Sequence, residues 1–262
     1  MSPFILLPLV SLTCVSLVMT VIWIWATKIK NAGIVDIVWA FDFAMIAIIT
    51  WVLADGAPLR KSIVGILTIL WSLRLGSYLL KRVGSHLDEE EGRYRQLRAE
   101  WAPHVNLKFF VFFQMQGISN VILCTPFFIS SLNPEPMLSV LEYTGACIWF
   151  LSVIGEGLAD WQLQQFKKDP INKGKVCQYG LWNYSRHPNY FFQLMIWIGV
   201  CIFSLSSPYG WISIICPLSI GYLIFKVTGI PMTEEQAIRS KGESYVAYQR
   251  TTSKFVPWPK KN

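Results

Sequence analysis

One short stretch of the sequence, residues 179–190, gathers side chains that can bind an anion and exchange hydrogen bonds. It reads YGLWNYSRHPNY. Pro188 suits the first turn of a helix, so Arg186 and His187 are expected to lie beside the free backbone N–H groups of a helix N-terminus. Such a terminus is a natural anion site. The stretch therefore predicts a site for a phosphorylated cofactor.

A stripe of polar residues precedes that stretch. Glu156, Asp160, Leu163 and Lys167 follow the i, i+4, i+7, i+11 spacing of one helical face. Exposed i, i+4 partners would give the same pattern, and this is the structural alternative. Because the stripe leads directly into residues 179–190, we expect both segments to contribute to one site.

A third group of polar residues falls within apolar segments. Ionisable side chains cost about 2.5–3.5 kcal/mol in the middle of a membrane helix and usually mark a site or a pathway. Aromatic walls with a few polar contacts suit a flat apolar ligand. The group comprises Asp36, Asp42, Arg74 and Tyr78, with Trp39 and Trp71 beside them. The structural alternatives are that Asp36 is hydrated at a membrane end and that Asp42 and Arg74 form an ion pair.

The elements that position these residues are predicted to be membrane helices. The chain of 262 residues is 53% hydrophobic and 15% aromatic, more apolar than a single soluble core requires. A spanning helix needs roughly 20 apolar residues. Seven such segments occur, at residues 3–26, 34–54, 62–80, 107–131, 138–159, 190–206 and 209–227. The first lacks a basic region before it and is expected to be retained as a helix.

The placement of positive charge predicts an orientation. Of the 23 lysines and arginines, 20 fall in alternate loops and the tail when seven spans are drawn, and such loops stay cytoplasmic. The N-terminus is then outside and the C-terminus cytoplasmic. Because the net charge of +7 is dispersed over separate loops, it does not indicate nucleic-acid binding.

The remaining features favour one all-α polytopic membrane domain covering residues 1–262. Five of the six cysteines fall in spans and no CxxC pair occurs, so neither a metal site nor a disulfide framework is expected. The hydrophilic loop 81–106 is predicted to contain an amphipathic or solvated helix. Residues 1–131 are expected to form the substrate pocket and residues 138–262 the cofactor site.

Residues 184–190 resemble the R-H-P-N-Y motif of membrane sterol and steroid reductases. The tail is similar to the C-terminal region of the same group in Glu234-Glu235, Gly242, Tyr245, Tyr248 and Phe255-Val256-Pro257-Trp258. Asp160 and Lys167 stand where that superfamily places an acidic or amide residue and a base. The likeness is to the steroid 5α-reductase family and its bacterial relatives, over roughly residues 34–260.

The resemblance implies NADPH-dependent reduction of the carbon–carbon double bond of a 3-oxo-Δ4-steroid or a similar lipid enone. It places the cofactor on Glu156, Asp160, Lys167, Tyr184, Arg186, His187, Asn189, Tyr190, Glu235 and Tyr245. The family's Gln-Glu pair is absent from residues 34–54. We therefore expect Asp36, or second Tyr78, to polarise the ketone, with Asp42 and Arg74 as its orienting pair and Trp39 and Trp71 in the pocket wall.

Two other interpretations remain open. A membrane carboxyl methyltransferase of the isoprenylcysteine type, using S-adenosylmethionine, has a related Arg-His-Pro motif and a tail with a Glu pair. A lipid-binding or scaffolding protein is the non-enzymatic alternative. The expected partners are a lipid-like substrate and membrane lipids, with no obligate protein partner. The expected location is a bacterial inner membrane or the endoplasmic reticulum.

Overall fold

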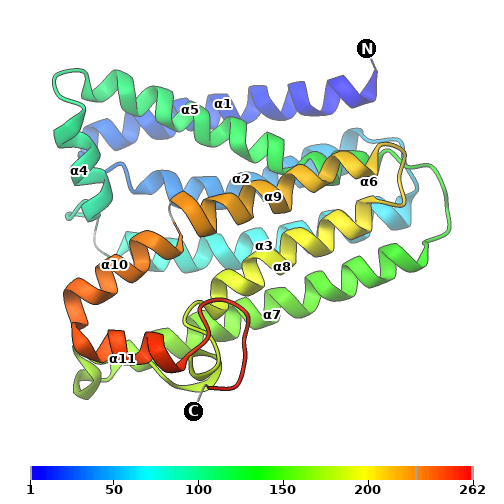
Figure 1. Cartoon of the computed structure of the whole chain (residues 1–262). Helices are drawn as coiled ribbons and strands as arrows, with labels where there is room; N and C mark the ends of the chain where they lie inside the picture. Colours follow the sequence, from blue (N-terminus) through cyan, green and yellow to red (C-terminus); the bar gives the residue numbers. More distant parts are fainter. Residues whose placement is uncertain (1, 86, 228, 261–262) are drawn as a thin grey trace. The chain divides into compact units, whose positions relative to one another are not determined.

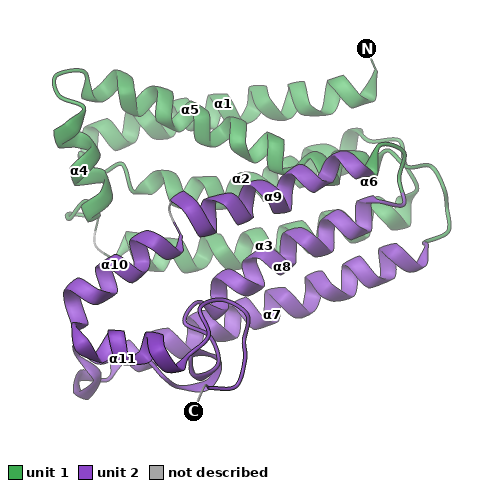
Figure 2. Cartoon of the chain, in the orientation of Figure 1, with its two compact units in different colours: residues 1–138, 207–210 green, residues 139–206, 211–262 purple. Residues whose placement is uncertain are grey.

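The described part of the chain is helical, in agreement with the predicted all-α class. The computed structural model describes residues 2–85, 87–227 and 229–260. Within these ranges no strand occurs, and the only β-type pairing is an isolated bridge between Ser185 and Ser253. The chain divides into two compact units (Figures 1 and 2). Unit 1 comprises residues 1–138 and 207–210, and unit 2 comprises residues 139–206 and 211–262.

The described residues of unit 1 form six helices. They are α1 (Pro3–Ile29), α2 (Ile34–Leu53), α3 (Pro58–Gly84), α4 (Gly92–Glu100), α5 (Val105–Leu123) and α6 (Thr125–Ser131). Helix α2 packs mainly on α3, and α1 packs mainly on α5. The hydroxyl of Ser72 fastens α3 to α2, because it donates to the carbonyl of Ala40 at 2.6 Å and accepts from the N–H of Ala44 at 3.1 Å.

The loop before α4 is tied to the start of α2 by Glu90. Its carboxylate accepts two hydrogen bonds of 2.8 Å from Arg98 and one of 2.8 Å from the backbone N–H of Ala32. Burial alone would raise the pKa of Glu90, but these hydrogen bonds outweigh it and hold the pKa below its ordinary value of 4.5. The predicted loop 81–106 thus contains a short helix, α4, and is anchored by ionic contacts.

Unit 2 is built on two long helices. These are α7 (Val140–Lys168) and α8 (Pro188–Ser204). The shorter elements are η1 (Pro170–Asn172), η2 (Gly180–Asn183), η3 (Gly210–Ile214), α9 (Ile215–Tyr222), the π-helical η4 (Leu223–Val227), α10 (Ile230–Lys241) and α11 (Glu243–Thr251). The first residue of η3, Gly210, is assigned to unit 1. A capping box starts α7, because Ser139 and Glu142 each bond the other's backbone N–H.

Small residues bring α7 and α8 into close contact. A Cβ atom on Gly145 would lie 2.5 Å from the carbonyl oxygen of Gly199 and 2.5 Å from the backbone nitrogen of Phe203. Trp149 follows Gly145 by one turn of α7, and a Cβ on Gly199 of α8 would lie 2.8 Å from the backbone nitrogen of Trp149. The two backbones therefore touch with no room for a side chain, which fixes the register of the helix pair that carries the site.

Five segments are long and apolar enough to cross a membrane among the residues described. They are Pro3–Ile29, Ile34–Leu53, Pro58–Gly84, Val105–Ser131 and Gly210–Lys241, while α8 is apolar but shorter. The chain is thus an all-α protein with several helices suited to a membrane. The count of seven spans and the orientation of the termini stay predictions.

Candidate functional site

The segment before α8 folds back onto α7. Gly180 has a φ of +57°, and a Cβ there would lie 2.3 Å from the amide nitrogen of Gln162, so this turn has no room for a side chain. The same Gln162 accepts a 2.9 Å hydrogen bond from the N–H of Leu181, and the indole of Trp182 donates to Ala159 O at 2.9 Å. Pro188 begins α8 as predicted.

Arg186 is buried and bonded to the C-terminal region of unit 2. Its Nε donates to Glu234 Oε1 at 2.7 Å, and its Nη1 donates to the carbonyls of Gln249 at 2.7 Å and Thr252 at 3.2 Å. The side chain is 9% exposed. Two of its three nitrogens therefore bond to other parts of unit 2.

Glu234 is the centre of this ionic cluster. Besides Arg186, its carboxylate lies 3.2 Å from Nε2 of the buried His187 and accepts a 3.1 Å hydrogen bond from Gln249. Burial raises the pKa of Tyr245 above its ordinary range, and the neighbouring Glu234 charge adds to that effect, so the phenol stays neutral. The cluster holds the N-terminus of α8 against α10 and α11.

Asn189 and Tyr190 connect the first turn of α8 to two other helices. The Asn189 amide donates to Asp160 on α7 at 3.3 Å, and the Tyr190 hydroxyl is 3.1 Å from Thr233 Oγ1 on α10. The Tyr190 ring also stacks on His187, with centroids 5.5 Å apart and 7° between the planes. The structure thus brings together four predicted cofactor residues: Asp160, His187, Asn189 and Tyr190.

A buried polar contact extends this arrangement along α7 and α8. Oriented to satisfy its neighbours, the amide of Gln193 donates to Glu156 Oε1 at 2.5 Å and accepts from the indole N–H of Trp197 at 3.2 Å. Glu156 is 4% exposed. Gln193 follows Asn189 by one turn, as Asp160 follows Glu156, so the two polar contacts form one seam between the helices.

Tyr184 and Glu235 lie away from this cluster. Tyr184 is exposed, and its backbone carbonyl accepts a 3.0 Å hydrogen bond from Trp258. Glu235 is exposed and pairs with Arg239 one turn further along α10. Of the glutamate pair in the tail, Glu234 rather than the predicted Glu235 faces the site, because adjacent residues of a helix such as α10 point in directions about 100° apart.

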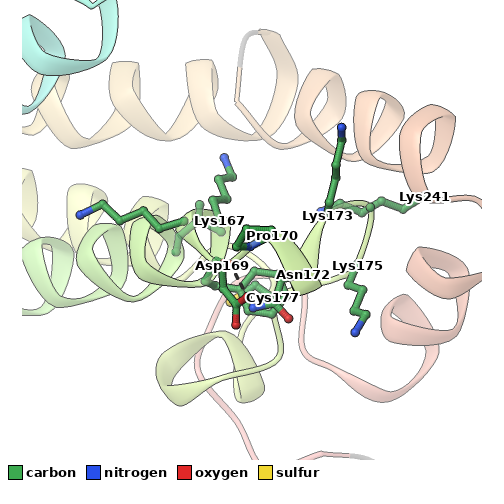
Figure 3. Close-up of a pocket in the computed structure, with 12 residues that line it drawn as sticks. Lys167, Asp169, Pro170, Asn172, Lys173, Lys175, Cys177 and Lys241 are labelled. Carbon is green, nitrogen blue, oxygen red and sulfur yellow. Dashed lines mark hydrogen bonds between the residues drawn. The ribbon is translucent and has the colours of Figure 1, made fainter.

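The C-terminal end of α7 opens into a pocket of about 410 Å³ (Figure 3). The predicted Lys167 lines it. Other residues contribute from α7, the following loop and the end of α10: Leu163, Phe166, Lys168, Asp169, Pro170, Asn172, Lys173, Gly174, Lys175, Cys177 and Lys241. Burial raises the pKa of the Cys177 thiol, while the nearby Lys241 and Lys167 charges oppose that rise.

The lysines of this pocket were not predicted, apart from Lys167. Among the described residues no carboxylate lies within ion-pairing distance of any of the five. The crowding of four lysines within residues 167–175 is visible in the sequence and could have indicated the site. The fifth, Lys241, is brought in only by the fold of the tail.

In unit 1 the predicted donor Asp36 is part of a salt bridge. Its carboxylate pairs with Arg93 and accepts a 2.8 Å hydrogen bond from the hydroxyl of Tyr94. Both partners belong to α4. The contact ties α4 to the start of α2, which gives Asp36 a structural role.

Asp42 lies deeper in α2 and is 3% exposed. Its carboxylate accepts a 3.3 Å hydrogen bond from the amide of Asn120, which also donates to the carbonyl of Trp39 at 3.1 Å. The partner that the structure gives Asp42 is therefore Asn120 on α5, where the sequence suggested Arg74. The opposite oxygen of the Asn120 amide is buried without a hydrogen bond.

The other predicted pocket residues of unit 1 lie on two helices: Trp39 on α2, and Trp71, Arg74 and Tyr78 on α3. Trp71 is almost fully buried and packs edge-on against Phe43, with centroids 5.0 Å apart. Arg74 and Tyr78 follow on α3, one turn apart and half-buried. Trp39 donates from its indole to Ser119 at 3.1 Å.

The fold and site define a helical membrane protein whose α8 N-terminus and α7 C-terminus carry a polar, cation-rich site. The chain belongs to the family described as "Protein of unknown function (DUF1295)", whose sequence profile matches residues 22–252. Searches of curated proteins and of solved structures gave no match.

Proposed function

We propose that this protein is an NADPH-dependent reductase acting on the carbon–carbon double bond of a 3-oxo-Δ4-steroid or a similar lipid enone. In this proposal the chain has seven spans, with the N-terminus outside and the C-terminus cytoplasmic. The observation that carries the proposal is the continuity along α7 between the polar seam at Asp160 and the lysine pocket at Lys167.

The spacing suits an extended dinucleotide. Lys167 is the seventh residue after Asp160, a rise of about 10 Å along the helix. Phosphates held by lysines at one end would leave the nicotinamide end near Asn189 and Tyr190. Charge-assisted contacts to phosphate are the strong ones, and the pocket lysines are not neutralised by carboxylates of the described chain.

The same pocket argues against S-adenosylmethionine. That cofactor carries a sulfonium cation and no phosphate, so a cluster of lysines would repel it. The Arg-His-Pro motif, which the methyltransferase interpretation shares, is used within this fold to hold Glu234. Its presence therefore does not by itself favour a methyl donor.

When bound, NADPH supplies the hydride that adds to the β-carbon of the enone. The chain's own task is to stabilise the negative charge that builds on the carbonyl oxygen, which a buried hydrogen-bond donor does well. A buried carboxyl with no cation beside it is more stable with its proton on, and can then donate. Asp42 meets this description better than Asp36, which is paired with Arg93.

The cofactor class can be tested by direct binding. Purified full-length protein in nanodiscs is incubated with radiolabelled NADPH or S-adenosylmethionine, and retained label is measured after gel filtration. Retention of NADPH supports the reductase. Retention of S-adenosylmethionine alone would establish the methyltransferase alternative, and retention of neither would support a non-enzymatic role.

The donor can be tested with Asp42→Leu, Asp36→Leu and Tyr78→Phe, each of which removes the hydrogen-bond donor and keeps much of the side-chain volume. Loss of one donor of this kind typically costs about a hundredfold or more in rate. We expect Asp42→Leu to keep NADPH binding and lose most of the reduction rate. If all three variants reduce the enone at wild-type rates, the polarising group lies outside these three residues.

A further inference from the structure

The pocket at the end of α7 carries more positive charge than a dinucleotide diphosphate needs. Five lysines line it against one carboxylate, Asp169, a formal excess of four positive charges. Asp169 is itself occupied, since its Oδ1 accepts a 3.0 Å hydrogen bond from the N–H of Ile171. No ligand assignment from the sequence uses Lys168, Lys173, Lys175 or Lys241.

These lysines reach the pocket from separate elements. Lys167 and Lys168 end α7, Lys173 and Lys175 belong to the loop after η1, and Lys241 is the last residue of α10. Figure 3 shows Lys241 extending over the loop from α10, while Lys173 and Lys175 point to opposite sides of it. The loop itself is shaped by Asn172, whose amide donates to the carbonyl of Phe166 at 3.1 Å.

Four of the five lysines are exposed and Lys241 is half-buried, so water and salt screen part of their mutual repulsion, and an anion bound among them would offset the rest. The diphosphate bridge of a dinucleotide brings about two negative charges, and a phosphomonoester adds about 1.5 to 2 more. Only the summed negative charge of the diphosphate and the phosphomonoester approaches the excess positive charge of the pocket lysines. The apolar side chains of Leu163, Phe166 and Pro170 in the same lining offer a surface for an adenine ring.

We propose that Lys173 and Lys241 bind the 2′-phosphate of the cofactor and so select NADPH over NADH. This inference rests on the proposed function, because it assigns the specificity of the same site. Lys173 and Lys241 are chosen because they line the pocket from two separate elements, the loop after η1 and the end of α10. Lys167 and Lys168 remain for the diphosphate.

The test measures binding and needs no turnover. Full-length protein in nanodiscs of zwitterionic lipid is titrated with NADPH, NADH and 2′,5′-ADP by calorimetry. We compare the wild type with the double variant Lys173→Gln/Lys241→Gln. A hydrogen bond to a charged group is worth about 1.5–3 kcal/mol, so Kd for NADPH and 2′,5′-ADP should rise at least about tenfold, while Kd for NADH should change less than about threefold.

Two variants control for charge and for folding. Lys254→Gln removes an exposed lysine of the tail outside the pocket and should leave all three dissociation constants unchanged. Lys173→Arg/Lys241→Arg keeps both charges and should keep the preference for NADPH. If the Gln double variant fails to fold, the Arg pair and each single Gln variant still measure the preference.

The outcomes separate this inference from the proposed function. Equal weakening of NADPH and NADH in the Gln variant would overturn the specificity assignment and leave the reductase proposal standing. If the wild type binds neither NADPH nor NADH, both the specificity assignment and the reductase proposal are wrong. Binding of vesicles containing a phosphoinositide, with no competition by 2′,5′-ADP, would assign the lysines to a lipid headgroup and overturn the inference.

Discussion

Replacing Arg186 by alanine is expected to destabilise unit 2, in addition to any effect on a ligand. The change removes the cation beside Glu234 and the donor to two backbone carbonyls, those of Gln249 and Thr252. Removing one partner of a buried ion pair costs about 3–5 kcal/mol. Because Glu234 keeps 14% of its side chain exposed, water compensates in part, and we expect a loss of about 3 kcal/mol at the lower end of that range.

The assay is thermal unfolding of purified protein in detergent, followed by the fraction that still elutes as a monodisperse peak. Arg250→Ala, which removes an exposed arginine of α11, is the matched control. A double-mutant cycle with Glu234→Ala isolates the pair, and the double variant should lose less than the sum of the single changes.

The opposite result would refute this reasoning. If Arg186→Ala unfolds at the wild-type temperature but binds NADPH at least about tenfold more weakly, the guanidinium acts on the ligand and its internal bonds contribute little.

Three further outcomes are expected. Gly145→Ala should lower the free energy of unfolding by about 1–3 kcal/mol, because its methyl group overlaps the backbone of α8, whereas Gly92→Ala, with open space at its Cβ, should be nearly neutral in the same thermal assay. Because the pKa of Glu90 is lower in the folded chain than in the unfolded one, its stabilising effect is present above pH 4.5 and is lost as pH falls through the folded value. The unfolding temperature of the wild type should therefore fall more steeply below about pH 5 than that of Glu90→Gln; parallel curves would contradict this. Asn189→Ala should impair turnover without a change in unfolding temperature, and full activity would remove Asn189 from the site.

The sequence predicted where helices occur better than where they end. From hydropathy, the fifth membrane helix was predicted to end at residue 159, whereas α7 continues to Lys168. Hydropathy measures the fit to lipid, whereas the helix continues as long as its polar residues tolerate helical geometry. In the same way residues 107–131 form two helices, because the chain turns at Cys124 and a new helix begins at Thr125 with Pro126 in its first turn.

Within the site, local spacing was informative and distant contacts were not. The helical stripe and the helix start at Pro188 drew attention to Asp160 and Asn189, which share a hydrogen bond in unit 2. The burial of Arg186 could not be predicted, because its partners lie 48 to 66 residues further along the chain. For the same reason the sequence did not distinguish Glu234 from Glu235, or add Lys241 to the lysines of the loop.

The dependence of residues 184–187 on the tail has a consequence for biosynthesis. Ser185 donates to the carbonyl of Phe255 at 2.8 Å, and the N–H of Arg186 donates to the carbonyl of Ser253 at 2.9 Å. Chains are made from the N-terminus onward, so all the long apolar helices leave the ribosome before these two partners do. A chain that is still being made, or that terminates early, can thus insert these helices in a membrane while the loop that carries Arg186 and His187 is still unsupported. The cluster at Glu234 closes only after residues 249–255 have been made.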